Sequence, residues 1–157
     1  MLGKDHPDVL SARAQLAVWL GEAGDAAGAA QALADLLSEM VRVLGEDHPD
    51  TITTRNDLAG WQIEAEDAAG AARTYEEIRE ARRRLLGENH PETLAAWGSS
   101  AHWRGQAGDA AGAVAVTEQP LEHMLRVLGD DHPHVQVIRQ NLAHWRKEAQ
   151  GCTPGPG

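Results

Sequence analysis

The sequence repeats itself with a period of 42 residues, and this period constrains the fold more than any other feature. The segment Leu-Gly-x-Asp/Asn-His-Pro begins at Leu2, Leu44, Leu86 and Leu128, with no insertion between copies. A tryptophan follows each of these leucines 17 residues later. Fixed periods of about 20–50 residues are typical of arrays in which each unit buries its apolar face only against its neighbours. We therefore expect a stacked array of repeats.

The composition favours an all-α fold. Apolar residues make up 42% of the chain, which has five Trp, one Tyr and no Phe. Most of them are Ala and Leu, which are the best helix formers, whereas β-branched residues are sparse. The expected core is therefore helical and built mainly from Ala and Leu.

Each copy carries the signals of a first helix that opens at His-Pro. Proline suits the first turn, where its missing N–H has no partner, and the residue before proline is held extended. The histidine is therefore a candidate N-cap. In copy one the apolar stripe has the spacing of one helical face, with residues Ala12, Leu16, Trp19 and Ala23. We expect this stripe and the four repeated tryptophans to form the core between helices.

A second helix follows in each complete copy. Gly24 ends the first helix, because glycine readily adopts a left-handed C-terminal conformation, and Asp25 caps the second helix. The second helix then runs to the next Leu-Gly. Its apolar stripe in copy one comprises Ala29, Leu33, Leu36, Met40 and Val43.

These signals predict seven helices in three and a half repeats. The solenoid spans residues 1–150, and its units are residues 2–43, 44–85 and 86–127 with a half repeat at 128–149. The Gly/Pro-rich tail, residues 151–157, is expected to be disordered.

The helix–turn–helix unit resembles the tetratricopeptide repeat (TPR). The resemblance rests on the segment Asn56–Ala59, the Gly24-Asp25 turn and the small residue Ala29. The 42-residue period and the His-Pro connector are similar to the long variety found in kinesin light chains and in many bacterial signalling proteins. Two features depart from the family pattern: Ala26, Ala68 and Ala110 replace the usual tyrosine, and Glu66 replaces a turn glycine. A HEAT-like helical array, whose period is also about 40–47 residues, is the alternative fold.

The resemblance implies a right-handed superhelix of antiparallel helix pairs that acts as a protein–protein interaction scaffold. It also implies that the chain is a segment of a longer array, and that the first helices line a concave groove. The candidate groove residues are Gln15, Glu22, Asn56, Asp57, Glu64, Ser99, His102, Gln140, Asn141 and His144. Amide side chains can bond the backbone of an extended peptide, whereas carboxylates favour Lys or Arg on it. The alternative interpretation of this polar face is simple solvation.

The charge of the chain bears on its partners. The formal net charge of −10 disfavours nucleic acid and membrane surfaces and favours a basic peptide. The single cysteine, Cys152, allows no internal disulfide. No signal peptide is recognisable, and no apolar run approaches the roughly 20 residues that span a bilayer. These features indicate a cytoplasmic protein.

No residue pattern indicates catalysis or a cofactor. A nucleophile–base pair, a phosphate-binding glycine loop and a paired-carboxylate site are all missing from the sequence. Four of the eight histidines occupy one repeat position, at His6, His48, His90 and His132. Stacked helices lie roughly 10 Å apart, which is too far for these histidines to share a metal ion. We therefore expect a protein that is not an enzyme and binds no metal.

Three features break the repeat. Trp97 stands where the other copies have arginine, and we favour a core filler over an exposed interaction residue. Arg79 and Arg82–Arg84 form a basic cluster, for which docking of an acidic partner is one interpretation. We favour a solvated helix face, paired with Glu76, Glu77 and Glu80 of the same helix. Pro120 lies inside a second helix and is expected to kink or split it near Gln119.

Self-association is the alternative function. Both ends of a stack expose faces that an adjacent repeat would cover, so copies could stack end to end into a homo-oligomer. A sequence regularised by design is less favoured, because the copies differ irregularly.

Overall fold

The computed structural model describes residues 3–151, and all regular structure within this range is helical. The seven predicted helices are confirmed. They are α1 (Pro7–Glu22), α2 (Ala26–Leu44), α3 (Pro49–Glu64), α4 (Ala68–Leu86), α5 (Pro91–Gln106), α6 (Ala110–Leu128) and α7 (Pro133–Gly151). The last helix therefore continues past its expected end at residue 149. The rest of the predicted disordered tail, residues 152–157, lies outside the described residues.

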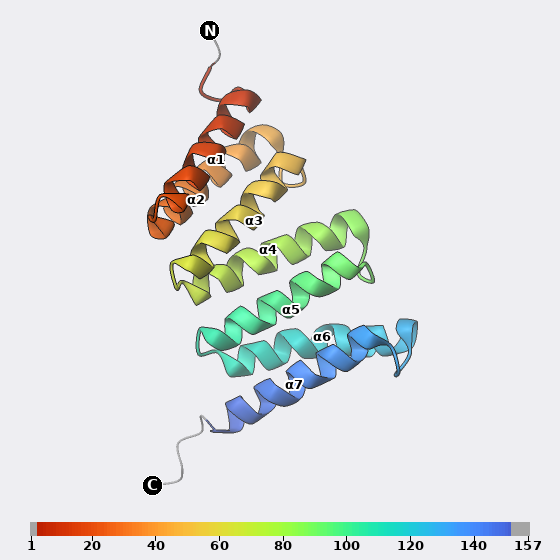
Figure 1. The fold of residues 1–157 in the computed structure, drawn as a ribbon. Helices are drawn as coiled ribbons and strands as arrows, with labels where there is room; N and C mark the ends of the chain where they lie inside the picture. Colours follow the sequence, from red (N-terminus) through yellow and green to blue (C-terminus); the bar gives the residue numbers. More distant parts are fainter. Residues whose placement is uncertain (1–2, 152–157) are drawn as a thin grey trace.

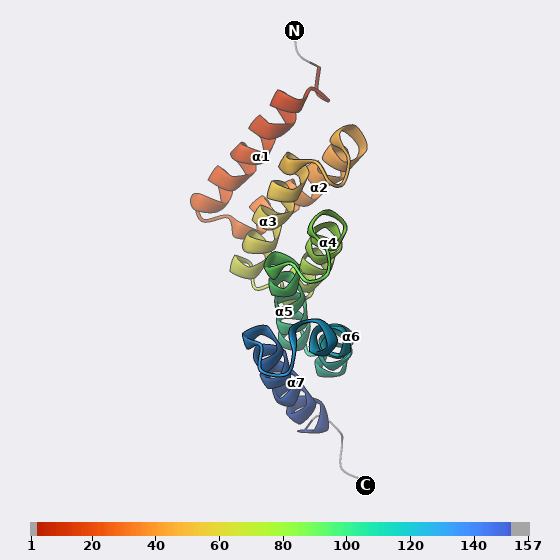
Figure 2. The same ribbon diagram turned by 90° about the vertical axis from the view of Figure 1, so that its right-hand side faces the viewer.

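The helices form a two-layered solenoid. Each helix packs on the next one along the chain (Figure 1), and α1 makes no contact with α7. Seen from the side, the odd-numbered helices form one layer and the even-numbered helices the other (Figure 2). The apolar clusters follow this pattern. One joins Leu33 and Leu37 of α2 to Leu58 of α3, and another joins Met124 of α6 to Val135 of α7. The fold is thus the predicted array, in which the apolar clusters lie between neighbouring helices and not in one central core.

The predicted caps are present at both kinds of helix. The backbone N–H of Asp8 donates to Nδ1 of His6 at 3.2 Å, and the other three connector histidines accept equivalent bonds. At the second helices, the N–H of Gly28 donates to the carboxylate of Asp25 at 2.8 Å. The histidines therefore serve as N-caps, which accounts for four of the eight.

Tryptophans of the first helices fill hollows over glycines of the preceding first helix. A Cβ atom added to Gly21 would lie 2.7 Å from the ring of Trp61, and one added to Gly105 would collide with Trp145. The corresponding position before Trp103 is Ile63, which leaves no such hollow. Accordingly, α1 approaches α3 and α5 approaches α7, but no Cα of α3 lies within 8 Å of α5 in the described chain.

The predicted burial of the stripe in copy one is wrong. Leu16 is 64% exposed and Trp19 is 58% exposed, whereas Leu58, at the position of Leu16 in the next repeat, is 5% exposed. In the next repeat the same position does form a packing surface, because Leu58 packs on α2. In α1, however, no described helix covers it.

Pro120 does not split its helix. The α-helix α6 is continuous from Ala110 to Leu128, and Pro120 is buried inside it. Of the two expected effects, the split near Gln119 is therefore wrong, whereas a kink of the continuous helix stays a prediction. A proline removes a single backbone hydrogen bond of a helix. The packing of α6 between α5 and α7 holds the remaining turns together.

Trp97 is a core filler, as expected. It packs against the cluster of Leu94 and Ile138, and the guanidinium of Arg79 lies 5.1 Å from the centre of its ring.

The arginine cluster follows its prediction only in part. Arg83 pairs with Glu80 at 2.6 Å, but Arg84 reaches Asp47 in the preceding connector at 2.8 Å.

Unlike Glu80, the glutamates Glu76 and Glu77 form no ion pair with Arg82, Arg83 or Arg84 among the described residues. Glu76 pairs with Arg104 at 2.8 Å, and Glu77 pairs with Arg55 at 3.3 Å. These arginines lie on first helices, so the ion pairs tie neighbouring helices to one another.

Candidate functional site

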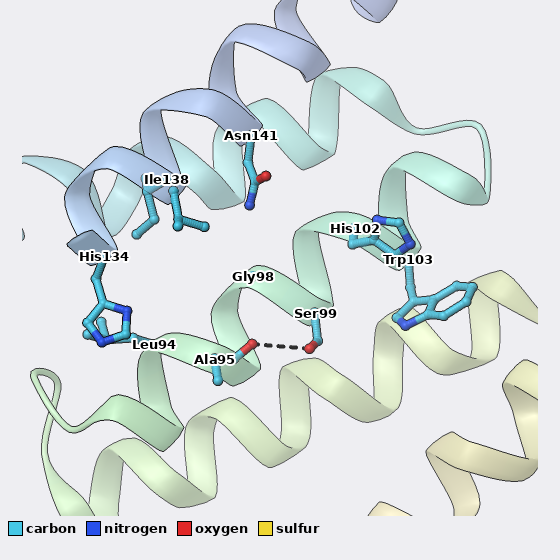
Figure 3. A pocket seen from close by; sticks show the side chains of 10 residues that line it. Leu94, Ala95, Gly98, Ser99, His102, Trp103, His134, Ile138 and Asn141 are labelled. Carbon is cyan, nitrogen blue, oxygen red and sulfur yellow. Dashed lines mark hydrogen bonds between the residues drawn. The ribbon is translucent and has the colours of Figure 1, made fainter.

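A pocket of about 360 Å³ lies between α5 and α7, on the layer formed by the first helices (Figure 3). Its apolar lining comprises Leu94, Ala95, Gly98, Trp103, Val137 and Ile138. Its polar lining comprises Ser99, His102, His134 and Asn141. In Figure 3 the two histidines stand at opposite ends of the pocket, and Asn141 reaches from α7 towards α5. The pocket is therefore an apolar depression with hydrogen-bonding groups around it.

The close pairing of α5 with α7 creates this pocket. The seating of Trp145 over Gly105 brings the two helices together at one end, and Leu94, Val135 and Ile138 pack together at the other. Gly98, in the middle of α5, has no neighbour within 4 Å of where its Cβ would be. Its lack of a side chain keeps the space open.

The polar groups of the pocket remain available to a ligand. The hydroxyl of Ser99 donates to the carbonyl oxygen of Ala95 at 3.1 Å, which leaves the lone pairs of its oxygen free to accept. No hydrogen bond to the side chain of Asn141 is found among the described residues. An amide in this state can both donate to and accept from a peptide backbone.

Three of the ten predicted groove residues meet in this pocket, namely Ser99, His102 and Asn141. His144 and Gln140 lie on α7 outside it and are exposed. On α1 and α3, the exposed residues outside it are Gln15, Glu22 and Glu64. The pocket thus brings together both candidates of α5 and one of the three on α7, but none of those on α1 and α3.

Asn56 is engaged by the protein itself. Its Nδ2 donates to the carbonyl oxygen of Ile52 at 2.9 Å, and its Oδ1 accepts from Arg82 at 3.5 Å. A ligand would have to displace the contact with Arg82 in order to use this amide.

Asp57 is a predicted groove residue whose carboxyl is partly removed from water. It is half-buried on α3, at the repeat position of Ser99 and Asn141, and no cation of the described chain forms an ion pair with it. Burial raises the pKa of its carboxyl above the usual value for aspartate. A carboxylate that is partly removed from water without a counterion favours the approach of a cation.

Sequence reasoning missed several residues of the pocket wall, of which His134 is the most informative. The first turn of the other first helices carries an acid at this position, as Asp8, Asp50 and Glu92, whereas α7 carries His134. This break in the repeat was the available signal. Part of the apolar wall, namely Ala95, Gly98 and Val137, also lies at the repeat positions expected to line the groove. The rest, such as Leu94 and Ile138, depends on how closely α5 and α7 approach.

The described residues contain no group of three or more His, Cys, Asp or Glu side chains arranged to hold a metal ion. Likewise, none of the helices between residues 3 and 151 is long and apolar enough to cross a membrane.

The fold is similar to that of solved repeat proteins. Nearly identical TPR-like repeats of a protein from Podosopora anserina, described as a kinesin light chain, match 97% of this chain and 72% of that one, with a TM-score of 0.78 and 21% identity. A substituted variant of the same repeats gives a TM-score of 0.75. BtubC (BKLC) from P. vanneervenii matches 99% of this chain and 70% of that one, with a TM-score of 0.59 and 19% identity.

The sequence comparisons identify the family. No curated protein matches the chain by sequence. A family profile described as Tetratricopeptide repeat matches residues 9–50 and 51–92, which together exceed half of the chain. Such repeats generally act as protein–protein interaction scaffolds, and their fold is typically non-enzymatic. The chain belongs to the tetratricopeptide repeat family.

Proposed function

We propose that this chain is a non-enzymatic scaffold that binds an extended peptide along the layer of first helices. The pocket between α5 and α7 takes an apolar side chain of the peptide, and Asp57 on α3 attracts a lysine or arginine. The observation that carries this proposal is the pocket, in which an apolar lining meets the amide of Asn141 and the accepting oxygen of Ser99.

The pocket has the character of a binding site for an apolar anchor. Ligand pockets typically measure about 300–1,000 Å³, are lined mainly by apolar side chains and hold a few orienting polar groups. This pocket is at the lower end of that range, which suits a side chain such as leucine or methionine better than a whole cofactor. The amide of Asn141 is placed to bond the backbone of the same peptide residue.

The electrostatics favour a basic peptide. The chain carries a net charge of −10, which attracts cations at long range. At short range, the half-buried Asp57 gains a counterion only when a ligand supplies one. The candidate residues Glu22 and Glu64 add exposed negative charge to the first helices.

A titration with fluorescently labelled peptides tests this function. Peptides with one leucine and one arginine at varied separation are titrated into the full chain, and anisotropy is recorded. We expect saturable binding that weakens with Asp57→Asn and with Val137→Asp. The matched control is Glu122→Gln, which removes an exposed acid of α6 and should leave the affinity unchanged.

Two results would count against the proposal. One is that no peptide of the set binds saturably. The other is that Glu122→Gln weakens binding as much as Asp57→Asn does, because binding would then depend on overall charge. The bacterial signalling context, which the resemblance implies, remains a prediction. So does the cytoplasmic location, which the cysteine usage and the lack of a recognisable signal peptide indicate.

A further inference from the structure

A second groove lies between α2 and α4, which belong to the same layer of the solenoid (Figure 2). No Cα atom of α2 lies within 8 Å of α4 in the described chain, so the two helices stand apart over α3. Two adjoining hollows of about 520 Å³ and about 580 Å³ occupy this space, and both are lined by Arg55, Arg73 and Glu77. We call them together the α2–α4 groove. Its apolar wall on α2 comprises Ala34, Leu37 and Val41.

Arg55 is a buried cation of this groove with one unused donor. Its side chain is only 7% exposed. The Nε atom donates to Oε2 of Glu77 at 3.3 Å, and Nη1 donates to the carbonyl oxygen of Glu46 at 2.9 Å. Its Nη2 forms no hydrogen bond with any described residue. Because a buried charged group is stabilised when its hydrogen bonds are completed, a ligand that brings an acceptor to Nη2 is favoured.

Arg73 is a second cation of the groove, and it has no partner. It is exposed on α4, lines both hollows and forms no hydrogen bond or ion pair within residues 3–151. The glutamates that line the groove, in contrast, each pair with an arginine already; they are Glu46, Glu76, Glu77 and Glu80. The uncompensated charge of the groove is therefore positive, although the chain as a whole is acidic.

The corresponding place between α4 and α6 is built differently. Trp97 stands there at the repeat position of Arg55, and Ala115 stands at the position of Arg73. The guanidinium of Arg79 lies 5.1 Å from the centre of the Trp97 ring. Neither cation of the α2–α4 groove thus recurs at its repeat position in α5 or α6, so the pair is not a general consequence of the repeat.

We propose that the α2–α4 groove is a second docking site, which binds a segment of another protein that carries a glutamate or aspartate beside an apolar residue. Arg73 and Nη2 of Arg55 hold the carboxylate, because a guanidinium matches a carboxylate in charge and in hydrogen-bond geometry. The apolar neighbour packs on the wall formed by α2. This site differs from the peptide groove of the first helices in its location and in the charge of its ligand.

A set of acidic peptides is the probe for this site. Fluorescently labelled peptides with one glutamate and one leucine at varied separation are titrated into the full chain, and anisotropy is recorded. We expect saturable binding. The best-binding peptide, remade with glutamine in place of glutamate, should bind at least about tenfold more weakly, as expected when charge-assisted hydrogen bonds are lost.

Variants of the protein locate the binding. Arg73→Gln should weaken binding of the acidic peptide by about tenfold or more. The matched control is Arg126→Gln, which removes an exposed and unpaired arginine of α6 and should leave the affinity unchanged. Asp57→Asn should not weaken this binding, which separates the site from the peptide groove. Because Arg73 is exposed and makes no contact of its own charge, circular dichroism should show a folded variant.

Three outcomes would overturn the proposal. The first is the absence of saturable binding by any acidic peptide. The second is equal affinity for the glutamate and glutamine peptides, or for wild type and Arg73→Gln. The third is an equal loss of affinity with Arg126→Gln and with Arg73→Gln, because binding would then follow the overall charge of the chain.

Discussion

At the scale of single residues, the turn at Glu66 has backbone strain that the equivalent turns of the other repeats avoid. Glu66 has a φ of 58°, and the equivalent residues of the other turns are Gly24 and Gly108, with φ values of 104° and 90°. The left-handed conformation costs a non-glycine residue about 1–2 kcal/mol, part of which the flexibility of an unfolded glycine offsets. We expect Glu66→Gly to raise the free energy of unfolding by about 0.5–1 kcal/mol in urea denaturation. Gly24→Ala should lower it, and a destabilised Glu66→Gly would show that the glutamate side chain holds the turn.

Two acids should give the stability opposite dependences on pH. The folded-state pKa of Asp57 is raised by burial, so ionising it opposes folding, and its contribution to stability falls as the pH rises from the unfolded-state pKa to the folded-state value. The pKa of Glu39 is lowered by the hydrogen bond from Arg13, so its contribution is lost as the pH falls through the lowered pKa. Urea denaturation from about pH 4 to about pH 7 should show that Asp57→Asn gains stability relative to wild type as the pH rises, whereas Glu39→Gln loses it. A parallel response of the two variants would contradict this assignment.

At the scale of elements, the spacing of first helices depends on which residue faces each tryptophan. Gly105 receives the ring of Trp145 and has no room for a Cβ atom, while Gly98, in the same helix, has nothing within 4 Å. We expect Gly105→Ala to lower the free energy of unfolding by about 1–3 kcal/mol through overpacking. Gly98→Ala, the matched control, should raise it by about 0.5–1 kcal/mol, because alanine is the better helix former. Thermal or urea denaturation checks both, and equal effects would show that the α5–α7 contact does not depend on this hollow.

The elements themselves could be predicted from the sequence, because their signals are local. The His-Pro openings, the Asp25-type caps and the closing Leu-Gly pairs lie next to the turns that they form. The candidate site could be predicted only in part. The family resemblance places Ser99, His102 and Asn141 in one groove, but the pocket that they line also requires the close approach of α5 and α7. That approach depends on contacts such as Trp145 over Gly105, which join residues that lie far apart in the sequence.

At the scale of the whole molecule, the repeat position of a residue does not fix its contribution to stability. That contribution depends on which neighbouring helices cover the residue. Trp19 and Trp145 occupy the same position, yet Trp19 is 58% exposed and Trp145 is 5% exposed. In an array, stability is close to a sum of units and of the interfaces between neighbours. A tryptophan at an uncovered end therefore contributes little, whereas one inside an interface contributes much.

This asymmetry predicts unequal effects of one substitution at two equivalent sites. Trp145→Ala should lower the free energy of unfolding by about 3–5 kcal/mol, the usual cost of emptying a buried aromatic site. Trp19→Ala should lower it by about 1 kcal/mol or less, as for exposed residues. Urea denaturation followed by circular dichroism measures both without depending on tryptophan emission. If Trp19→Ala proved as costly as Trp145→Ala, the face of α1 that carries Trp19 would be covered in the isolated chain.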